Sequence, residues 1–352
     1  MKKVYFFTLA FISMQFQFCE KTPDYEKIPV VIVPAEPGKW RQMLDTSNIE
    51  MIQTAFFSIG NRGFTINPQT NEVFEYNATD NKIIRKKSFP GPRRLSMATA
   101  FAIGGNGYYG LGLGQKNLKE GSQTQWGYVY RVDLWKYDPM NDEWTRKSDC
   151  PIPPNVYQYD PKQSSFFGAY GIVINNKAYI GSGRDINFSI RRYLYEYEPQ
   201  ADKWRAIVKD SADIYPPGHS NIVMAFAVAN KGYIGNTDTL WEFDPAAVLK
   251  WRQVRSVTGS TRQPVLSLGS STKGYVFGSL TSLNNIQPQM VKDFYEFTPD
   301  VNGGSWRTIT EFKGPARAGC PGFILNNRIY IGFGSNIAAK VLTDIWEYMP
   351  VP

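Results

Sequence analysis

Histidine and cysteine, which often serve as proton carriers, nucleophiles and metal ligands, are scarce in this sequence. The 352 residues include one histidine, His219 in the stretch PPGHSN, and three cysteines, Cys19, Cys150 and Cys320. A zinc or copper site built from cysteine and histidine needs three or four such ligands close together. A Ser–His–Asp triad would have to use His219, which no nucleophile-elbow motif accompanies. We therefore expect no metal, no cofactor and no catalytic residue. His219 is interpreted as a loop residue, with the triad as the alternative.

A second set of residues could bind ligands. Aromatic rings stack on apolar faces and guanidinium forks grip anions, so rings and arginines together suit sugars or carboxylates. Such residues gather in segments that have no counterpart elsewhere in the chain. The alternative is that these rings only pack the segments onto the body of the protein. The set comprises Trp126, Tyr128, Tyr157, Tyr159, Arg184, Asp185, Arg191, Arg192, Tyr215 and His219.

The elements that must position these residues come from a repeated phrase. DLWKYDPMNDEW at 133–144 returns as YLYEYEPQADKW at 193–204, TLWEFDPAAVLKW at 239–251 and DFYEFTPDVNGGSW at 293–306, and DIWEYMP at 344–350 lacks the tryptophan. Each phrase alternates as a strand does, turns at its Asp-Pro or equivalent, and starts a second strand at Trp. A tyrosine–glycine strand such as AYIGSG at 178–183 and a small-residue apolar strand such as GAYGIVI at 168–174 precede it. Each repeat therefore predicts four strands.

Six such repeats predict a β-propeller. A weaker first copy contains AFFSIG at 55–60, GFTI at 63–66 and VFEY at 73–76, with Ile84 in the place of Trp. Four-stranded units of about 50 residues cannot bury both faces alone, so they stack around an axis. The missing tryptophan of the last copy is assigned to GKWRQM at 38–43. We expect Trp40 to lie on the outer strand of the sixth blade, which closes the ring and leaves no open sheet edge.

These residues resemble kelch repeats, the propeller family that includes galactose oxidase. In that family an apolar strand precedes a Tyr-h-h-Gly-Gly strand, followed by Tyr-Asp-Pro and Trp. The resemblance spans roughly residues 39–352 and implies an all-β, six-bladed kelch-type β-propeller. The paired glycines become GSG and GFG here, and blade one lacks Trp. The copper site of galactose oxidase uses two histidines and a Tyr–Cys cross-link, which a chain with one histidine cannot assemble.

Carboxylates that recur once per blade are expected to serve the blade rather than catalysis. They either pair with neighbouring strands or face solvent, and the residue at this position in the remaining blade is Lys136. The five are Glu75, Glu196, Glu242, Glu296 and Glu347.

Function is expected where the repeats differ. In a four-stranded meander the 2–3 loops and the blade-to-blade connections lie on one face, and the 1–2 and 3–4 turns on the other. The long segments at 113–130, 146–166, 184–192, 206–220, 279–292 and 335–342 all belong to the first, loop-rich face. Insertions on one face of a repeat array commonly mark the binding side. Three arginines, Arg93, Arg262 and Arg317, just precede innermost strands and are expected near the mouth of the central channel.

Charge and the N-terminus predict location. The net charge of +8 is scattered, whereas nucleic-acid binders concentrate charge, so no nucleic-acid partner is expected. Residues 1–18 have two lysines and then an apolar run, which is typical of a signal peptide. Cys19 stands where a bacterial lipoprotein is lipidated, with plain cleavage or an uncleaved anchor as alternatives. Residues 19–38 are then a linker, and Cys150 and Cys320 are expected as free thiols.

Two functions follow from these expectations. The first is a non-enzymatic, monomeric module of the bacterial cell envelope that binds a protein or glycan ligand through the loop-rich face and meets the membrane only through its lipid. The alternative is a sugar-active propeller enzyme resembling the bacterial kelch epimerases that mutarotate sialic acid. That enzyme would need an acid–base pair. The candidate carboxylates that do not repeat are Asp185 and Asp238.

Overall fold

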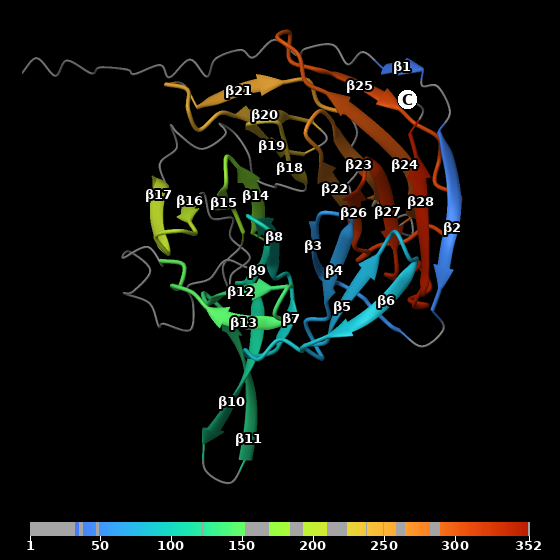
Figure 1. Ribbon diagram of the computed structural model, residues 1–352. Helices are drawn as coiled ribbons and strands as arrows, with labels where there is room; N and C mark the ends of the chain where they lie inside the picture. The colour runs from blue at the N-terminus through green and yellow to red at the C-terminus, as the bar shows by residue number, and fades with distance from the viewer. Residues whose placement is uncertain are drawn as a thin grey trace, which may run out of the picture.

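The computed structural model describes residues 32–34, 38–46, 49–120, 123–151, 169–183, 193–209, 224–236, 238–248, 250–257, 265–281 and 289–350. Within these residues all regular structure is β, and most of it forms six antiparallel four-stranded blades around a central axis (Figure 1). The predicted six-bladed propeller is confirmed.

Each blade runs from an innermost to an outermost strand. Blade 1 contains β3 (Ala55–Ile59), β4 (Arg62–Ile66), β5 (Val73–Asn77) and β6 (Lys82–Lys86). Blade 2 contains β8 (Thr99–Ile103), β9 (Asn106–Gly110), β12 (Leu134–Asp138) and β13 (Glu143–Arg146). Blade 3 contains β14 (Tyr170–Ile174), β15 (Lys177–Gly181), β16 (Tyr193–Glu198) and β17 (Lys203–Lys209).

The second half repeats this order. Blade 4 contains β18 (Met224–Val228), β19 (Lys231–Gly235), β20 (Leu240–Phe243) and β21 (Trp251–Val254). Blade 5 contains β22 (Leu266–Gly269), β23 (Gly274–Thr281), β24 (Gln289–Thr298) and β25 (Ser305–Thr308). Blade 6 contains β26 (Gly322–Leu325), β27 (Arg328–Gly332), β28 (Asp344–Met349) and, from the other end of the chain, β2 (Lys39–Asp45).

Ring closure occurs where the sequence predicts it. Strand β2 pairs with β28 so that Trp40 lies opposite Tyr348. The Trp40 indole donates a hydrogen bond of 3.0 Å to the carbonyl oxygen of Thr310, just past the outer strand of blade 5. The same bond joins three other neighbouring blades, from Trp144 to Lys87, Trp204 to Ser148 and Trp306 to Arg255, at 2.9–3.1 Å. Trp40 is therefore the tryptophan that the last repeat lacks.

The register corrects one assignment in blade 1. The blade tryptophans lie opposite an aromatic residue of the third strand, as Trp144 lies opposite Tyr137. In blade 1 the partner of Tyr76 is Ile83, whereas Ile84 pairs with Glu75 and is exposed. Ile83, not Ile84, takes the place of the tryptophan. A shift of one residue moves a side chain to the opposite face of a strand.

Two segments extend the blades. Strand β1 (Ile32–Pro34), in the predicted linker, pairs in parallel with β25 and adds a fifth strand to blade 5. Between the second and third strands of blade 2, β10 (Leu113–Glu120) and β11 (Gln123–Tyr130) form a hairpin that projects from the ring (Figure 1). The first of these strands also pairs with β7 (Arg94–Ser96). The long 2–3 segment of blade 2 is thus a regular hairpin.

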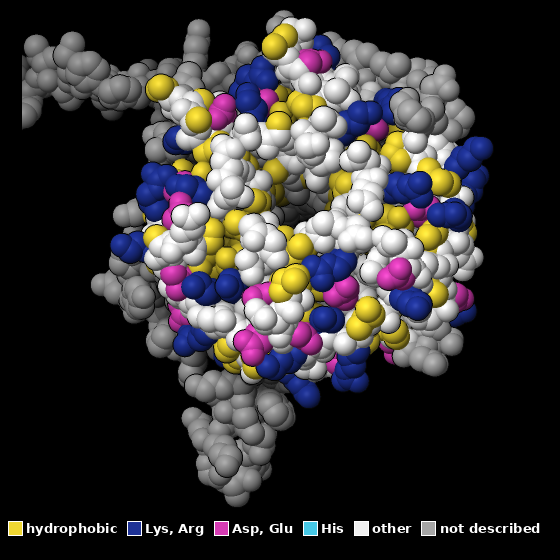
Figure 2. All heavy atoms as spheres, viewed as in Figure 1, with side chains coloured by type: hydrophobic (Ala, Val, Ile, Leu, Met, Phe, Trp, Pro, Cys, Tyr) yellow, Lys and Arg dark blue, Asp and Glu magenta, His cyan; other side chains and the backbone are white. Residues whose placement is uncertain are grey.

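Packing between blades forms the core. The innermost strands follow one another around the axis in chain order, and β26 returns to β3. Aromatic side chains fill the wedges between blades, for example Phe226, Phe297 and Trp306 between blades 4 and 5. The centre of the ring stays hollow (Figure 2). The buried thiols of Cys150 and Cys320 are free, as expected.

Candidate functional site

The recurring glutamates are buried centres of ion pairs. Glu196 on β16 receives Lys177 of the second strand at 3.0 Å and Arg205 of the fourth strand at 2.8 Å. The hydroxyl of Tyr179 donates a third bond to it at 2.8 Å. Glu75, Glu242, Glu296 and Glu347 pair in the same manner with cations of their own blades, at 2.7–3.7 Å. These carboxylates hold strands together.

The charged state of these glutamates is stabilised. Burial raises the pKa of Glu196, but hydrogen bonds from Arg205, Lys177 and Tyr179 outweigh it, so the pKa lies below its usual value. Burial is likewise outweighed at Glu242 and Glu347, whose pKa values are also lowered. A general acid at neutral pH needs a raised pKa, which is the opposite of this shift.

Blade 2 shows that the glutamate and its cations form one unit. Its third strand has Lys136 where the others have glutamate. The position of Lys177 is taken by Asn106, and the position of Arg205 by Thr145 opposite Lys136. Both cations are therefore replaced together with the carboxylate.

Arg317, one of the arginines expected at the channel mouth, lies inside the protein at 1% exposure. Its guanidinium donates to Asp344 at 2.8 Å and to the carbonyl oxygen of Phe333 at 3.1 Å. The indole of Trp346 donates to the same carboxylate. These internal partners engage the guanidinium, and we therefore leave Arg317 out of the proposed binding surface.

The equivalent residue before blade 2 is Arg94 rather than Arg93. Arg94 is fully buried and donates to Asp133 at 2.7 Å and to the carbonyl oxygen of Leu111 at 2.8 Å. Arg93 beside it is exposed. Both buried arginines end the sequence pattern Phe-x-Gly-Pro-x-Arg, at 89–94 and 312–317. The glycine is required because a Cβ on Gly91 would lie 2.3 Å from the Phe89 ring.

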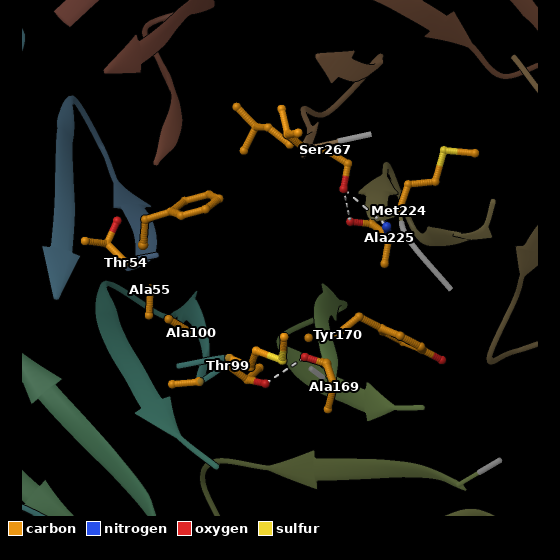
Figure 3. A pocket seen from close by; sticks show the side chains of 15 residues that line it. Thr54, Ala55, Thr99, Ala100, Ala169, Tyr170, Met224, Ala225 and Ser267 are labelled. Atoms are coloured by element: carbon orange, nitrogen blue, oxygen red, sulfur yellow. Dashed lines mark hydrogen bonds between the residues drawn. The ribbon is translucent and has the colours of Figure 1, made fainter. Parts of the chain in front are cut away.

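A cavity of about 370 Å³ opens where the innermost strands begin, which is the loop-rich end of the channel (Figure 3). Blades 1 to 5 contribute to it, and much of its wall consists of backbone and small side chains such as Ala55, Ala100 and Ala225. The innermost strands pair on one side only, so their other backbone edge faces the channel. The cavity therefore offers backbone donors and acceptors as well as side chains.

Two hydroxyl groups at the cavity form hydrogen bonds between neighbouring blades. The Thr99 hydroxyl donates to the carbonyl oxygen of Ala169 at 2.9 Å, from blade 2 to blade 3. The Ser267 hydroxyl donates to the carbonyl oxygen of Ala225 at 3.0 Å and accepts its N–H, from blade 5 to blade 4 (Figure 3). The hydroxyl oxygen of Thr54 is buried and has no hydrogen-bond partner among the described residues. Thr54 therefore has unused hydrogen-bonding capacity beside the cavity, although its oxygen is shielded from solvent and the side chain would have to rotate before a ligand could use it.

The described lining of this cavity is uncharged. Its polar side chains are hydroxyls, Thr54, Thr99, Tyr170 and Ser267, and the rest are apolar. Two features stand out, the ring of Phe56 and the side chain of Met97, which is 52% exposed. Sequence inspection for charged and catalytic residues missed them. The signal was present in the repeat alignment, because Phe56 occupies a position where the other blades have small residues.

Most residues predicted to bind ligands fall outside the described residues. Trp126 and Tyr128 lie on β11, opposite Asn117 and Gln115 of β10. Asp238 is described and exposed, in the 2–3 loop of blade 4. The structure does not bring these three to the cavity lining that it describes. Outside the described residues are Cys19, Tyr157, Tyr159, Arg184, Asp185, Arg191, Arg192, Tyr215, His219 and Arg262.

Another cavity on the described surface is less suitable. A cavity of about 660 Å³ lies on the short-turn side between blades 4 and 5. The cations Lys231 and Arg252 that line it are paired with Glu242, and Lys250 donates to backbone carbonyls. No group of histidine, cysteine or carboxylate side chains suited to a metal ion occurs among the described residues.

Comparisons with known proteins support the fold. Neither the protein-family models nor the curated proteins include a match. The solved structure of YjhT is similar over 86% of this chain and 96% of its own, with a TM-score of 0.66 and 16% identity. In the described part of the chain we find no helix long and apolar enough to cross a bilayer. Structural similarity at this low sequence identity supports the propeller fold alone. The function has to be inferred from the residues of the candidate site.

Proposed function

We propose that this protein is an exported kelch-type propeller, anchored by a lipid at Cys19, that binds a glycan or protein partner through its loop-rich face. The cavity at the channel mouth is the observation that carries the proposal. Its volume of about 370 Å³ is at the lower end of the roughly 300–1,000 Å³ of small-molecule sites. That size suits one or two sugar residues of a glycan better than a folded protein.

Two features favour binding over catalysis. Proton transfer requires an acid or base within hydrogen-bonding reach of the substrate. The described lining of the cavity has no carboxylate, histidine, lysine or arginine. The recurring glutamates are already engaged in ion pairs within their blades.

The pattern of the blades supports kelch membership. Five blades combine a tyrosine–glycine second strand with an aromatic third strand, and in each of these a tryptophan lies opposite that third strand. The tryptophan also reaches the preceding blade in four of them.

A ligand screen tests the binding role. The chain from residue 20 onward would be applied to a glycan array and to immobilised envelope extracts. Retention on a defined glycan, lost when free glycan competes, is the expected result. Mutarotation of sialic acid above background that disappears in Asp185→Ala and His219→Ala would overturn the binding role in favour of an enzyme.

Membrane tethering has a separate test. Labelled palmitate should be incorporated into the wild-type chain and not into Cys19→Ser, and the variant should leave the membrane fraction. Cys150→Ser, which removes a buried thiol, is the matched control and should remain labelled. Equal labelling of the wild type and Cys19→Ser would exclude lipidation at this residue.

A further inference from the structure

The channel wall has one aromatic residue at a position that is otherwise small. One residue of each innermost strand lies opposite the residue after the recurring ring of the second strand, as Phe56 lies opposite Thr65. The equivalent residues in blades 2 to 6 are Ala100, Gly171, Ala225, Ser267 and Gly322. Phe56 lines the cavity at the channel mouth and also a second cavity further along the channel. Its ring packs edge-to-face against the ring of Phe323.

The other blades form without a ring here, although Phe56 also packs against the hydrophobic clusters that contain Leu266 and Phe323. Five blades pack around the same axis with a glycine, alanine or serine at this position. A phenyl ring at the rim of an open channel leaves apolar surface unburied, and Phe56 is only partly buried. A ligand with an apolar face would cover that surface.

Met97 is a second apolar residue at the same channel mouth, and its backbone conformation is unfavourable. Its backbone is left-handed, with φ at 58°, and its side chain is 52% exposed. Left-handed backbone is costly for a residue with a Cβ, and strain of this kind clusters at ligand sites. Met97 connects β7, which pairs with the hairpin, to β8 in blade 2, next to blade 1 and Phe56. One side of the mouth is therefore apolar.

The remaining wall is suited to hydroxyl groups. The Thr54 hydroxyl, in the residue before β3, has no partner among the described residues, and the channel-facing backbone edges add donors and acceptors. No described lining residue is charged. A pyranose ring combines an apolar C–H face with hydroxyls at its rim and fits both sides of such a site.

We propose that the channel mouth binds a single uncharged sugar ring, stacked on Phe56, covered by Met97 and hydrogen-bonded to the Thr54 hydroxyl after that side chain rotates toward the cavity. This proposal rests on the glycan-binding role given above and names the ligand class and the residues in contact with it. Ring stacking of this type contributes about tenfold to affinity.

Titration of the full-length chain, held in a detergent without a sugar headgroup, tests it. The probes are the methyl glycosides of glucose, galactose and mannose, with glucuronic acid and N-acetylneuraminic acid as the acidic arm. We expect at least one neutral glycoside to bind. Phe56→Tyr keeps a ring and should bind within about threefold of the wild type, whereas Phe56→Leu should bind at least about tenfold more weakly.

Two further variants separate contact from folding. Thr54→Val is isosteric and should weaken binding without lowering the melting temperature, because it removes a hydroxyl with no partner among the described residues. Ile324→Val, at the other end of the channel, is the matched control and should bind as the wild type does. Met97→Gly removes both the side chain and the strain of the left-handed backbone. It should bind the sugar more weakly than the wild type does, and its melting temperature should be no lower than that of Met97→Ala.

The outcomes distinguish this proposal from the broader one. Equal binding by Phe56→Leu and Phe56→Tyr would overturn the stacking role while leaving glycan binding intact. Tighter binding of the acidic sugars would overturn the ligand class. Retention on the glycan array without binding of any neutral glycoside would also overturn the proposed ligand class. If the protein is not retained on the array and binds no glycoside, both this proposal and the glycan-binding role are refuted.

Discussion

Single buried charges in this propeller secure loops whose backbone is strained. Arg94 and Arg317 each bind one aspartate and the carbonyl oxygen of one left-handed residue, Leu111 or Phe333. These two residues have φ near 57° at the position where the kelch pattern has glycine. The guanidinium therefore compensates locally for a backbone conformation that residues with a Cβ disfavour.

Removing that guanidinium should be costly. Arg94→Ala leaves Asp133 buried without its cation and is expected to lower the free energy of unfolding by about 3–5 kcal/mol. Arg93→Ala, at the exposed neighbouring position, should change it by less than about 0.5 kcal/mol. Urea denaturation of the two variants compares them directly. Equal effects would mean that Arg94 is not the anchoring residue.

Acid should weaken the contact between blades 2 and 3. Burial raises the pKa of Asp202, but the Ser148 N–H and hydroxyl, the Tyr197 hydroxyl and Lys147 outweigh it and lower the pKa to about 2. Because the pKa of Asp202 is lower in the folded than in the unfolded protein, this carboxylate stabilises the fold at pH values above the pKa of an unfolded aspartate, which is about 3.9. This stabilisation is lost as the pH falls toward and below the pKa of Asp202 in the folded protein.

Asp202→Asn isolates this effect. The variant should be less stable than the wild type at neutral pH, and the difference should shrink between about pH 5 and pH 2. Unfolding curves across that range measure it. Glu143→Gln, at an exposed residue with no ion pair among the described residues, serves as control. A difference that is independent of pH would show that the charge of Asp202 does not contribute.

At the scale of strands, β2 is the element on which ring closure depends. Its tryptophan contacts Phe294 and Phe312 of blade 5 and Tyr348 of blade 6, with ring centroids 4.8–5.4 Å apart. The Trp40 indole also bonds to Thr310. One residue from the N-terminal part of the chain thus joins the two blades next to the closure.

Trp40→Ala should lower the free energy of unfolding by about 2–3 kcal/mol, because Trp40 is partly buried and deleting a fully buried aromatic side chain costs about 3–5 kcal/mol. Trp40→Phe keeps most of the packing and loses the hydrogen bond, which is worth about 1 kcal/mol. Gln42→Ala on the same strand is exposed and should be neutral. Thermal or urea unfolding gives all three values, and a Trp40→Ala protein as stable as its parent would contradict the closure.

At the scale of the whole molecule, closure removes an exposed sheet edge. Deleting residues 1–37 removes β1 and leaves β2, so the ring stays closed and the protein should remain soluble and unfold cooperatively. Deleting residues 1–46 also removes β2 and exposes the edge of β28, which invites aggregation. Size-exclusion chromatography and circular dichroism compare the two truncations. A monomeric, cooperatively unfolding 47–352 chain would show that closure by β2 is dispensable.

Much of the architecture could be predicted from local sequence patterns. Strand alternation, the Asp-Pro turn and the tryptophan recur at blade length, and each blade is built mainly from consecutive residues. The number of blades, the closure by Trp40 and the structural role of the glutamates follow from repetition alone. The assignment of Ile84 to the place of the tryptophan depended on a single register and was wrong by one residue. The buried arginine before blade 2 is Arg94, the neighbour of the Arg93 that we expected near the channel mouth. Alternation sets the face of a strand residue, and nothing in the local sequence distinguished the two neighbours.

The sequence by itself determined the repeat, and therefore the ring, because neighbouring strands in a blade are neighbours in the chain. Only the tertiary structure decided the site. Thr54, Thr99, Tyr170 and Ser267 are brought together at one channel mouth from four different blades. Which hydroxyls bond between neighbouring blades, and that Thr54 bonds to no described residue, depends on distances between the blades. No local pattern encodes such distances, because they arise only when the ring closes.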